Sequence, residues 1–200
     1  MKRFGLFAAT VAALLTLSGC GAADSRPAIQ PGETAEDSAS FQLTYSGGDV
    51  WVTARFYRLD EEGEWEQGGY FSSLSSREVT GERKLDGTFL LTFQPDYTVE
   101  YSLKTGRHTS NGGIPVEKVG PEAPPAEGFQ EETAVWLTEK TEPEMGEETP
   151  VALYGYKEDG SMGSHELEDF FTPESLSDLD FAQAVTVEFT EEEPSISPED

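Results

Sequence analysis

The amino-acid sequence predicts an all-β fold, an antiparallel β-sandwich of about eight strands. Three observations predict it. From residue 41 onward, apolar and polar residues alternate with a period of two, as on half-buried strands. Short runs rich in Gly, Pro, Asp and Glu separate these segments. Helical periodicity is almost absent, so we expect one short helix near the C-terminus. An immunoglobulin-like path and a jelly-roll path both fit this pattern, and a partly open barrel is the alternative.

The predicted strands follow the alternating segments in chain order. They cover residues 41–45, 50–59, 65–74, 89–93, 97–103, 133–138, 151–156 and 181–189. Asp86-Gly87 predicts a hairpin turn, because a type I′ turn needs positive φ at both central residues. The glycines and prolines of residues 104–128 predict a long loop. Thr172-Pro173-Glu174 predicts a helix start, with Pro at the first helical position.

The N-terminus has the pattern of an export signal. Lys2 and Arg3 supply positive charge, and the fourteen residues of Phe4–Leu17 are uncharged. That run is shorter than the roughly 18 apolar residues of a membrane-spanning helix. Leu17-Ser18-Gly19-Cys20 follows, and Cys20 is the only cysteine of the chain, so it has no partner for an intramolecular disulfide.

Leu17-Ser18-Gly19-Cys20 resembles the lipobox of bacterial lipoproteins, an aliphatic residue and two small residues before a cysteine. The resemblance covers residues 1–20 only. It implies that Cys20 receives a diacylglyceryl group, that a peptidase cuts before it, and that Cys20 becomes the mature N-terminus. Ordinary signal cleavage after Ala23 is the alternative, and both readings place the mature chain outside the cytoplasm. With the lipid, the chain is anchored on the extracytoplasmic face of the cell membrane.

The sequence divides into four parts. The segment after Cys20 is polar and small, with Ile29 its only large apolar residue, and therefore predicts a flexible tether. The last residues are acidic and predict a disordered tail. The predicted parts are a signal peptide (1–19), a lipidated cysteine with its tether (20–40), a β-sandwich domain (41–190) and the tail (191–200).

The charge excludes some partners. With 13 Lys and Arg against 39 Asp and Glu, the formal net charge is −26. Phosphate binding needs clustered Lys and Arg, so we expect no nucleic-acid partner and no adsorption to anionic lipid. A cationic partner, bound cations or high solubility alone are compatible with this charge. No sequence feature indicates a cofactor.

Few residues suggest catalysis or metal binding. His108 and His165 stand among small polar residues, which predicts solvated surface histidines. No Gly-x-Ser-x-Gly elbow is present. Two isolated histidines without a cysteine pair do not predict zinc, and Asp178 and Asp180 are a weak hint of calcium. We therefore predict no catalytic residue and no metal site.

One strand has a chemically distinctive face. At residues 50–59 the even positions Val50, Val52, Ala54 and Phe56 are apolar, while the odd positions carry Trp51, Arg55 and Tyr57. Flat aromatic rings with one forked donor suit a glycan, so these three residues are the candidate ligand-binding residues. The alternatives are that this strand is central and buried on both faces, or that Arg55 only stacks on Trp51 or Tyr57.

These features predict a lipid-anchored extracytoplasmic protein with a non-catalytic binding or interaction module. Its partner would be cell-wall glycan or another molecule at the cell surface, because the anchor holds the domain there. A carboxylate-based extracytoplasmic hydrolase is the alternative. It would need two carboxylates about 5 to 9 Å apart in a cleft, and with 39 acidic residues the sequence cannot nominate them.

Overall fold

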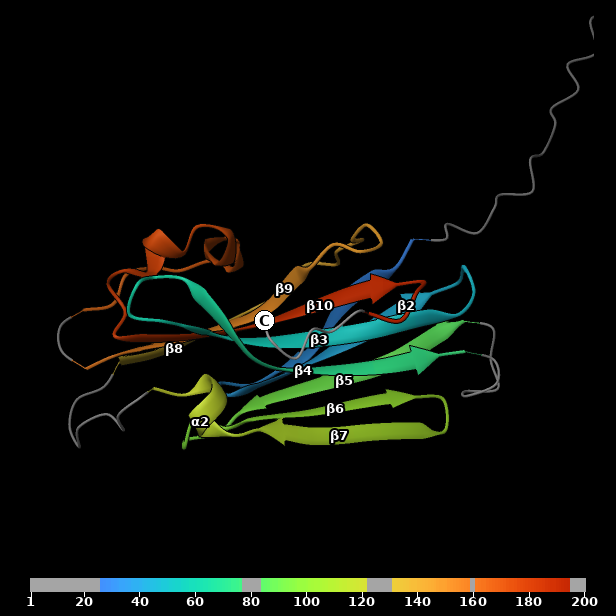
Figure 1. Ribbon diagram of the computed structural model, residues 1–200, viewed down its shortest axis with the longest axis horizontal. Coiled ribbons are helices and arrows are strands. Elements are labelled where there is room, and N and C mark those ends of the chain that lie inside the picture. The colour runs from blue at the N-terminus through green and yellow to red at the C-terminus, as the bar shows by residue number, and fades with distance from the viewer. Residues whose placement is uncertain (1–25, 77–83, 122–130, 159–160, 195–200) are drawn as a thin grey trace, which may run out of the picture.

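Two five-stranded antiparallel sheets lie face to face, which confirms the predicted β-sandwich (Figure 1). The computed structural model describes residues 26–76, 84–121, 131–158 and 161–194. The strands of the two sheets run along the same long axis, and the hydrophobic core lies between the sheets (Figure 1).

Ten strands are present among the described residues, two more than the sequence predicted. Sheet A consists of β1 (Ala28–Thr34), β2 (Ser38–Tyr45), β5 (Leu85–Phe93), β6 (Val99–Thr105) and β7 (His108–Ile114), in the order β1-β2-β5-β6-β7. Sheet B consists of β3 (Val50–Leu59), β4 (Trp65–Ser75), β8 (Glu131–Trp136), β9 (Thr149–Lys157) and β10 (Phe181–Thr190), in the order β4-β3-β10-β9-β8. The helical elements of the described residues are short: α2 (Val116–Val119) and two 3-10 turns, η1 (Leu167–Phe171) and η2 (Pro173–Leu176).

The core is made by the inward-pointing residues of both sheets. On β3 the even positions Val50, Val52, Ala54 and Phe56 are all buried there, as the alternation predicts. Phe41 of β2 is fully buried in the same cluster. Burying one such aromatic side chain stabilises the fold by about 1.5 to 3 kcal/mol.

Strand β1 occupies part of the segment that the sequence assigned to the tether. Ile29 is fully buried in the core, and the Ile29 backbone also pairs with Thr141 beyond sheet A. Pro31 lies within β1 opposite Phe41, which is tolerated because β1 is an edge strand. The tether prediction is therefore wrong for residues 28–40, where backbone pairing with β2 compensates for the low apolar content.

Asp86-Gly87 lies inside β5 and makes no turn, so that prediction is wrong. Gly87 pairs with Leu43 on one side and Thr105 on the other. A Cβ atom at Gly87 would lie 2.9 Å from Thr105 Cγ2. Glycine here permits close approach of two strands instead of the positive φ of a turn.

Strand β7 lies in the segment predicted to be a loop. Ile114 is its only buried side chain, and the other six residues are exposed or partly exposed. The strand forms because its backbone pairs with β6 along its whole length. A strand with so few apolar residues has no periodic signal in the sequence.

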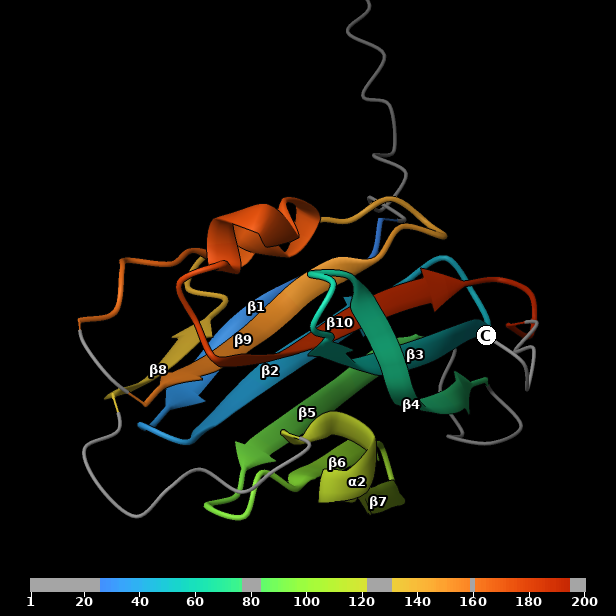
Figure 2. The same cartoon turned by 60° about the vertical axis from the view of Figure 1, so that its left-hand side comes forward.

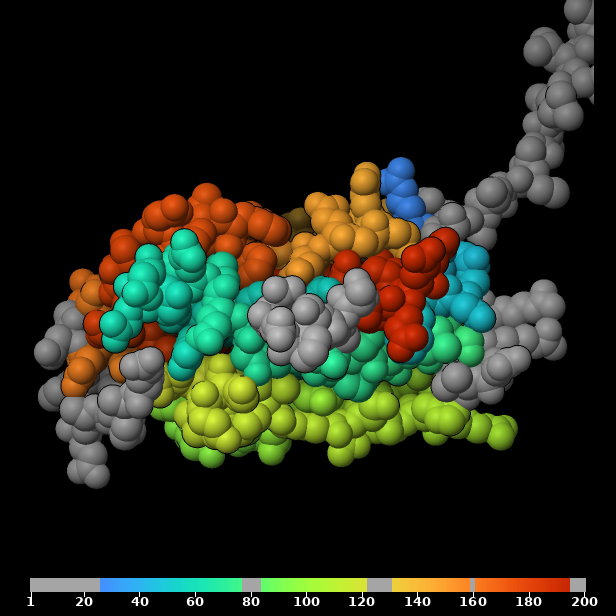
Figure 3. Space-filling model, viewed as in Figure 1, coloured from blue at the N-terminus to red at the C-terminus, as the bar shows by residue number. Residues whose placement is uncertain are grey.

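The outer face of sheet B is covered, and that of sheet A is open. The 3-10 turns η1 and η2 pack over β9, beside the curled start of β4 (Figures 2 and 3). Pro173 opens η2 as predicted, although the helix is a single 3-10 turn. In the described part of the chain, no helix packs on the outer face of β5, β6 and β7 (Figure 1).

The predicted signal peptide, Cys20 and most of the predicted tail lie outside the described residues. Of that tail, residues 191–194 are described, and residues 195–200 are not. Within the described ranges, no helix combines the length and the apolar character that crossing a membrane requires.

Candidate functional site

Trp51, Arg55 and Tyr57 do share one face of β3, on the outside of sheet B. The alternation of buried and partly exposed residues along β3 places them opposite the core side. Trp51 is partly exposed and stands in the ladder between Leu74 of β4 and Thr190 of β10. The three residues differ in what surrounds them.

Arg55 is held by two carboxylates. Its Nη1 atom lies 2.6 Å from Glu188 Oε2 and 3.3 Å from Glu148 Oε1. Burial alone would lower the pKa of Arg55, but the hydrogen bond and the charges of Glu188 and Glu148 raise it. The guanidinium charge is therefore matched inside the protein, and Arg55 is not a free donor for a ligand.

Tyr57 is also engaged. Its hydroxyl donates to Glu148 Oε2 at 2.9 Å, and the Thr186 hydroxyl donates to the same oxygen at 2.7 Å. Burial, and then the charge of Glu148, raise the pKa of the Tyr57 phenol, so it stays protonated. The Tyr57 ring lies 5.4 Å from that of Phe170 and 6.5 Å from that of Trp65. Tyr57 thus packs beneath η1 and the start of β4.

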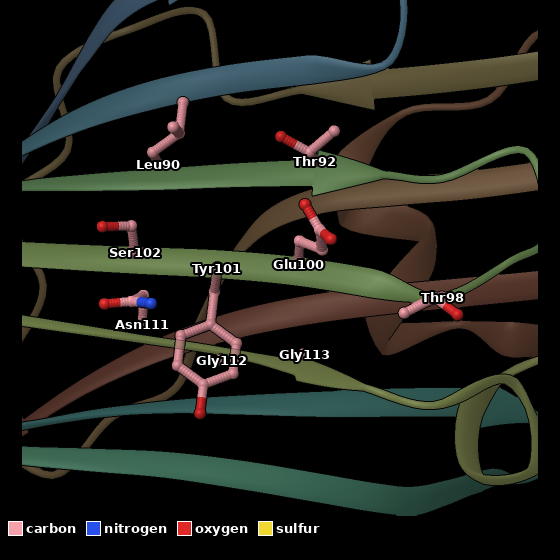
Figure 4. Close-up of a pocket in the computed structure, with 9 residues that line it drawn as sticks. All are labelled: Leu90, Thr92, Thr98, Glu100, Tyr101, Ser102, Asn111, Gly112 and Gly113. Carbon is pink, nitrogen blue, oxygen red and sulfur yellow. The ribbon is translucent and has the colours of Figure 1, made fainter.

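A different surface is hollowed, on the outer face of sheet A (Figure 4). The groove has a volume of about 380 Å³ and lies over β5, β6 and β7. The pairing of these three strands places the lining residues in two rows that run across the strands. One row is Leu90, Ser102 and Asn111, and the other is Thr92, Glu100 and Gly113. Neighbouring strands stand about 4.8 Å apart and rows about 7 Å apart, so the groove spans about 10 Å by 7 Å.

The hollow depends on one of two neighbouring glycines of β7. Gly113 leaves a gap beside Glu100, and a Cβ atom placed there would meet nothing closer than 3.8 Å. Gly112 points the other way, where a Cβ would lie 2.6 Å from the Tyr101 hydroxyl oxygen. The Tyr101 ring itself packs inward, 5.4 Å from Phe56.

The groove is lined by hydrogen-bonding groups. Thr92, Ser102 and Asn111 bring hydroxyl and amide groups, and Glu100 brings a carboxylate (Figure 4). Gln94 Nε2 donates to Glu100 Oε2 at 3.0 Å, which orients that carboxylate. Leu90, 45% exposed, adds an apolar surface at one edge. Such a surface suits a ligand rich in hydroxyl and amide groups.

His165 is buried, so its prediction as a solvated residue is wrong. Only 4% of its side chain is exposed, and its two ring nitrogens face carboxylates of the same segment. Nδ1 lies 3.5 Å from Asp169 Oδ2, and Nε2 lies 3.2 Å from Asp178 Oδ1. His165 therefore holds the segment around η1 and η2 together. His108 is exposed at the start of β7.

The hint of a calcium site at Asp178 and Asp180 has a structural explanation. The Asp178 carboxylate accepts the Gly163 backbone N–H at 2.8 Å, and that of Asp180 accepts the Glu158 N–H at 2.7 Å. Both carboxylates thus order the loop that leads into β10. Among the described residues, no group of three or more His, Cys, Asp or Glu side chains is arranged to hold a metal ion.

Comparison with known proteins identifies no relative of this chain. No family model matches the chain, and neither a search of curated proteins nor a search of solved structures finds a match. The function must therefore be argued from the residues of this chain.

Proposed function

We propose that this protein is a lipid-anchored extracytoplasmic binding module that holds a cell-wall glycan in the groove of sheet A. The observation that carries the proposal is the hollow over Gly113, bordered by the hydroxyl, amide and carboxylate groups of Thr92, Ser102, Asn111 and Glu100. Sugars present closely spaced hydroxyl groups, and N-acetylated sugars add an amide. Each of these four polar side chains has a donor or acceptor of matching type.

The sheet A groove suits a ligand better than the outer face of β3. There, Arg55 is already paired with Glu148 and Glu188, and Tyr57 is packed against Phe170. A ligand would have to displace these contacts. On sheet A the polar groups of the groove point outward, and no helix of the described ranges lies over them (Figure 4).

The groove favours binding over hydrolysis. A carboxylate hydrolase needs two facing acids, one on each side of the scissile bond. Of the nine described residues that line the groove, Glu100 is the only acid. The proposal therefore assigns no reaction to this site.

The anchor part of the proposal rests on the lipobox resemblance and on chain length. Seven residues separate Cys20 from Ala28, the first residue of β1. Fully extended, they span at most about 25 Å. A lipid at Cys20 would therefore keep the sandwich close to the membrane, with the beginning of β1 nearest to it.

The binding proposal is tested with purified peptidoglycan in a pull-down and soluble N-acetylglucosamine oligomers in a titration. Asn111→Ala removes one neutral hydrogen-bonding group and should weaken binding about three- to tenfold. Gly113→Val fills the hollow and should weaken binding about tenfold or more. Thr109→Ala is the matched control, because Thr109 lies on the same strand and face as Asn111 but outside the groove.

Two results would overturn this assignment. Binding that is equal in the Asn111, Gly113 and Thr109 variants would remove the groove as the site. Binding lost in Trp51→Ala, with the fold intact, would return the site to the outer face of β3.

The anchor is tested separately with Cys20→Ser. The variant should lose metabolic labelling by a fatty acid and should accumulate as an unprocessed precursor. Labelling that persists in Cys20→Ser would contradict lipidation without affecting the groove.

A further inference from the structure

A second cavity opens between the two sheets, at the end of the sandwich where β1 finishes. Its volume is about 520 Å³, within the range of small-molecule sites. Sheet A contributes the β1–β2 turn with Glu36 and Asp37, and the end of β5 with Phe93. Sheet B contributes Glu132 of β8 and Tyr154 of β9. The cavity lies at the opposite end of β1 from Ala28, the first residue of that strand.

The inner wall of this cavity is aromatic. The Phe93 and Tyr154 rings have centroids 5.1 Å apart, and Phe93 also packs against Trp136 at 5.3 Å. Phe93 is 3% exposed, so its position is fixed by the core. Burial, and then Glu132, raise the pKa of the Tyr154 phenol, which therefore remains neutral.

The rim of the cavity is acidic. Glu36, Asp37 and Glu132 are exposed and come from two separate parts of the chain. None of the ten described residues that line the cavity is Lys or Arg. The carboxylates of the rim therefore lack a cation from the lining itself.

We propose that this cavity binds an organic cation of the alkylammonium class, its charged head between the rim carboxylates and its alkyl part on the Tyr154 ring, against which Phe93 packs from the core side. A cation is attracted to the face of an aromatic ring as well as to a carboxylate. An inorganic cation would make no use of the Tyr154 ring, and an anion would face three negative charges. The combination of an aromatic ring and carboxylates selects a cation with an apolar body.

The proposal is independent of the glycan groove, which lies on the outer face of sheet A. An alkylammonium group can come from a free amine or from a lysine side chain of another protein. Both sources offer the same chemistry to the cavity, and the experiment separates them.

The experiment is an NMR or calorimetric titration of the intact domain with 1,5-diaminopentane and with a doubly capped lysine. Both should bind saturably, whereas 1-hexanol, a neutral chain of similar size, should not. Glu132→Gln and the double variant Glu36→Gln/Asp37→Asn should each weaken amine binding about two- to fivefold. Tyr154→Leu should weaken it by a similar factor through loss of the ring, while Tyr154→Phe keeps the ring and should stay within about twofold.

Glu117→Gln is the matched control, because Glu117 is an exposed acid of α2, outside the lining of the cavity. Equal weakening in Glu117→Gln and Glu132→Gln would mean general attraction to a chain of net charge −26 and would overturn the proposal. Absence of saturation, or equal binding of 1-hexanol, would overturn it as well.

The remaining comparisons show which kind of amine the cavity prefers and whether the cavity is separate from the groove of sheet A. Tighter binding of the capped lysine would indicate that the natural ligand is a lysine side chain of another protein. Tighter binding of the diamine would indicate a free amine. Either result supports a ligand of the alkylammonium class. Amine binding should be unchanged in Asn111→Ala. A loss of amine binding in that variant would contradict a separate cavity, whatever its effect on glycan binding.

Discussion

The outer faces of the two sheets are built from similar strands but differ in what is packed over them. Sheet B carries Arg55 and Tyr57 outward, and both are covered by carboxylates, η1 and the start of β4. Sheet A carries Asn111 and Glu100 outward, and no helix in the part of the chain that the structure describes packs over them. Polar and aromatic side chains on a sheet therefore do not by themselves indicate a binding site, because the elements packed over them decide whether a ligand can reach them.

The difference also predicts where mutations will act. A substitution on the outer face of sheet B removes internal contacts, so it should lower the free energy of unfolding. A substitution in the groove of sheet A removes contacts with solvent or ligand, so it should change binding and leave stability almost unchanged. The predictions below test this contrast, beginning with the largest expected effect.

Replacing Arg55 should have the largest effect. Its side chain is 17% exposed and lies against Glu188 and Glu148. Arg55→Ala leaves two carboxylates facing each other without a cation, and should cost about 3 kcal/mol of unfolding free energy. Urea denaturation of the variant and the wild type measures this cost.

The control for that prediction is Arg58→Ala on the same strand. Arg58 pairs with Glu66, whose side chain is 56% exposed, so its loss should cost less than about 1 kcal/mol. If Arg55→Ala cost no more than Arg58→Ala, the outer face of sheet B would be open enough to reconsider as a binding surface.

Two adjacent phenylalanines give the next largest contrast. The Phe170 ring stacks on Trp65 at 5.4 Å and contacts Tyr57, whereas Phe171 is 62% exposed. Phe170→Ala should destabilise the fold by about 2 kcal/mol, since the ring is partly buried. Phe171→Ala should stay within about 0.5 kcal/mol in the same thermal or urea melt. Equal effects would show that η1 does not cover the aromatic rings in solution.

Acidic pH should destabilise the segment around η1 and η2, which covers sheet B. The Gly163 N–H hydrogen bond is the main cause that lowers the pKa of Asp178, and the charge of His165 adds to it. Burial alone would raise the pKa of Asp169, but the Glu166 N–H, the Ser175 hydroxyl and His165 together lower it. Both carboxylates have a lower pKa in the folded state than in the unfolded state. Their charges therefore stabilise the fold fully above the unfolded pKa of about 3.9, and this contribution is lost as the pH falls through the folded pKa values.

The measurement is a series of melts from pH 6 to pH 2 at constant ionic strength. At the upper end of the series, the free energy of unfolding of the wild type should exceed that of Asp178→Asn by a constant margin on the order of 1 kcal/mol. The margin should shrink at the acid end, as the pH falls through the depressed pKa of Asp178. A margin that persists unchanged at pH 2 would contradict a role for the Asp178 charge.

The sequence predicts a strand only where apolar and polar residues alternate clearly within that strand. Strand β3 has the predicted bounds, and the buried even positions of residues 50–56 confirm the face that their alternation predicts. Strands β1 and β7 could not be found that way. β1 has Pro31 and Gly32 inside it, and β7 has Gly112 and Gly113, so both depend on pairing with a neighbour that is known only from the fold.

The candidate groove was missed for the same reason. Its rows join Leu90, Ser102 and Asn111 across three strands, and no local pattern states which strands are neighbours. The pair Gly112-Gly113 is the one available signal, and it indicates a groove only after β7 is recognised as a strand. Similarly, the partners of Arg55 are far away in the sequence, so its neutralisation could not be predicted.

The smallest expected effect contrasts the two neighbouring glycines of β7. Gly113 does not have positive φ, and a Cβ there would have contacts of 3.8 Å or more, so a side chain fits without strain. Glycine in a strand costs conformational entropy, and valine favours strands. Gly113→Val should therefore stabilise the domain by about 0.5 kcal/mol while it blocks the groove.

At Gly112 the same change should have the opposite sign. Its Cβ would lie 2.6 Å from the Tyr101 hydroxyl oxygen, and the Tyr101 ring is held against Phe71 at 4.9 Å and against Phe56. Gly112→Val must move that ring, and should destabilise the domain by about 1 to 2 kcal/mol. Thermal melts of the two variants decide the matter, because a groove and a packed interior predict different signs for adjacent residues. If both variants lost stability equally, Gly113 would not border an open hollow, and the binding site proposed on sheet A would lose its basis.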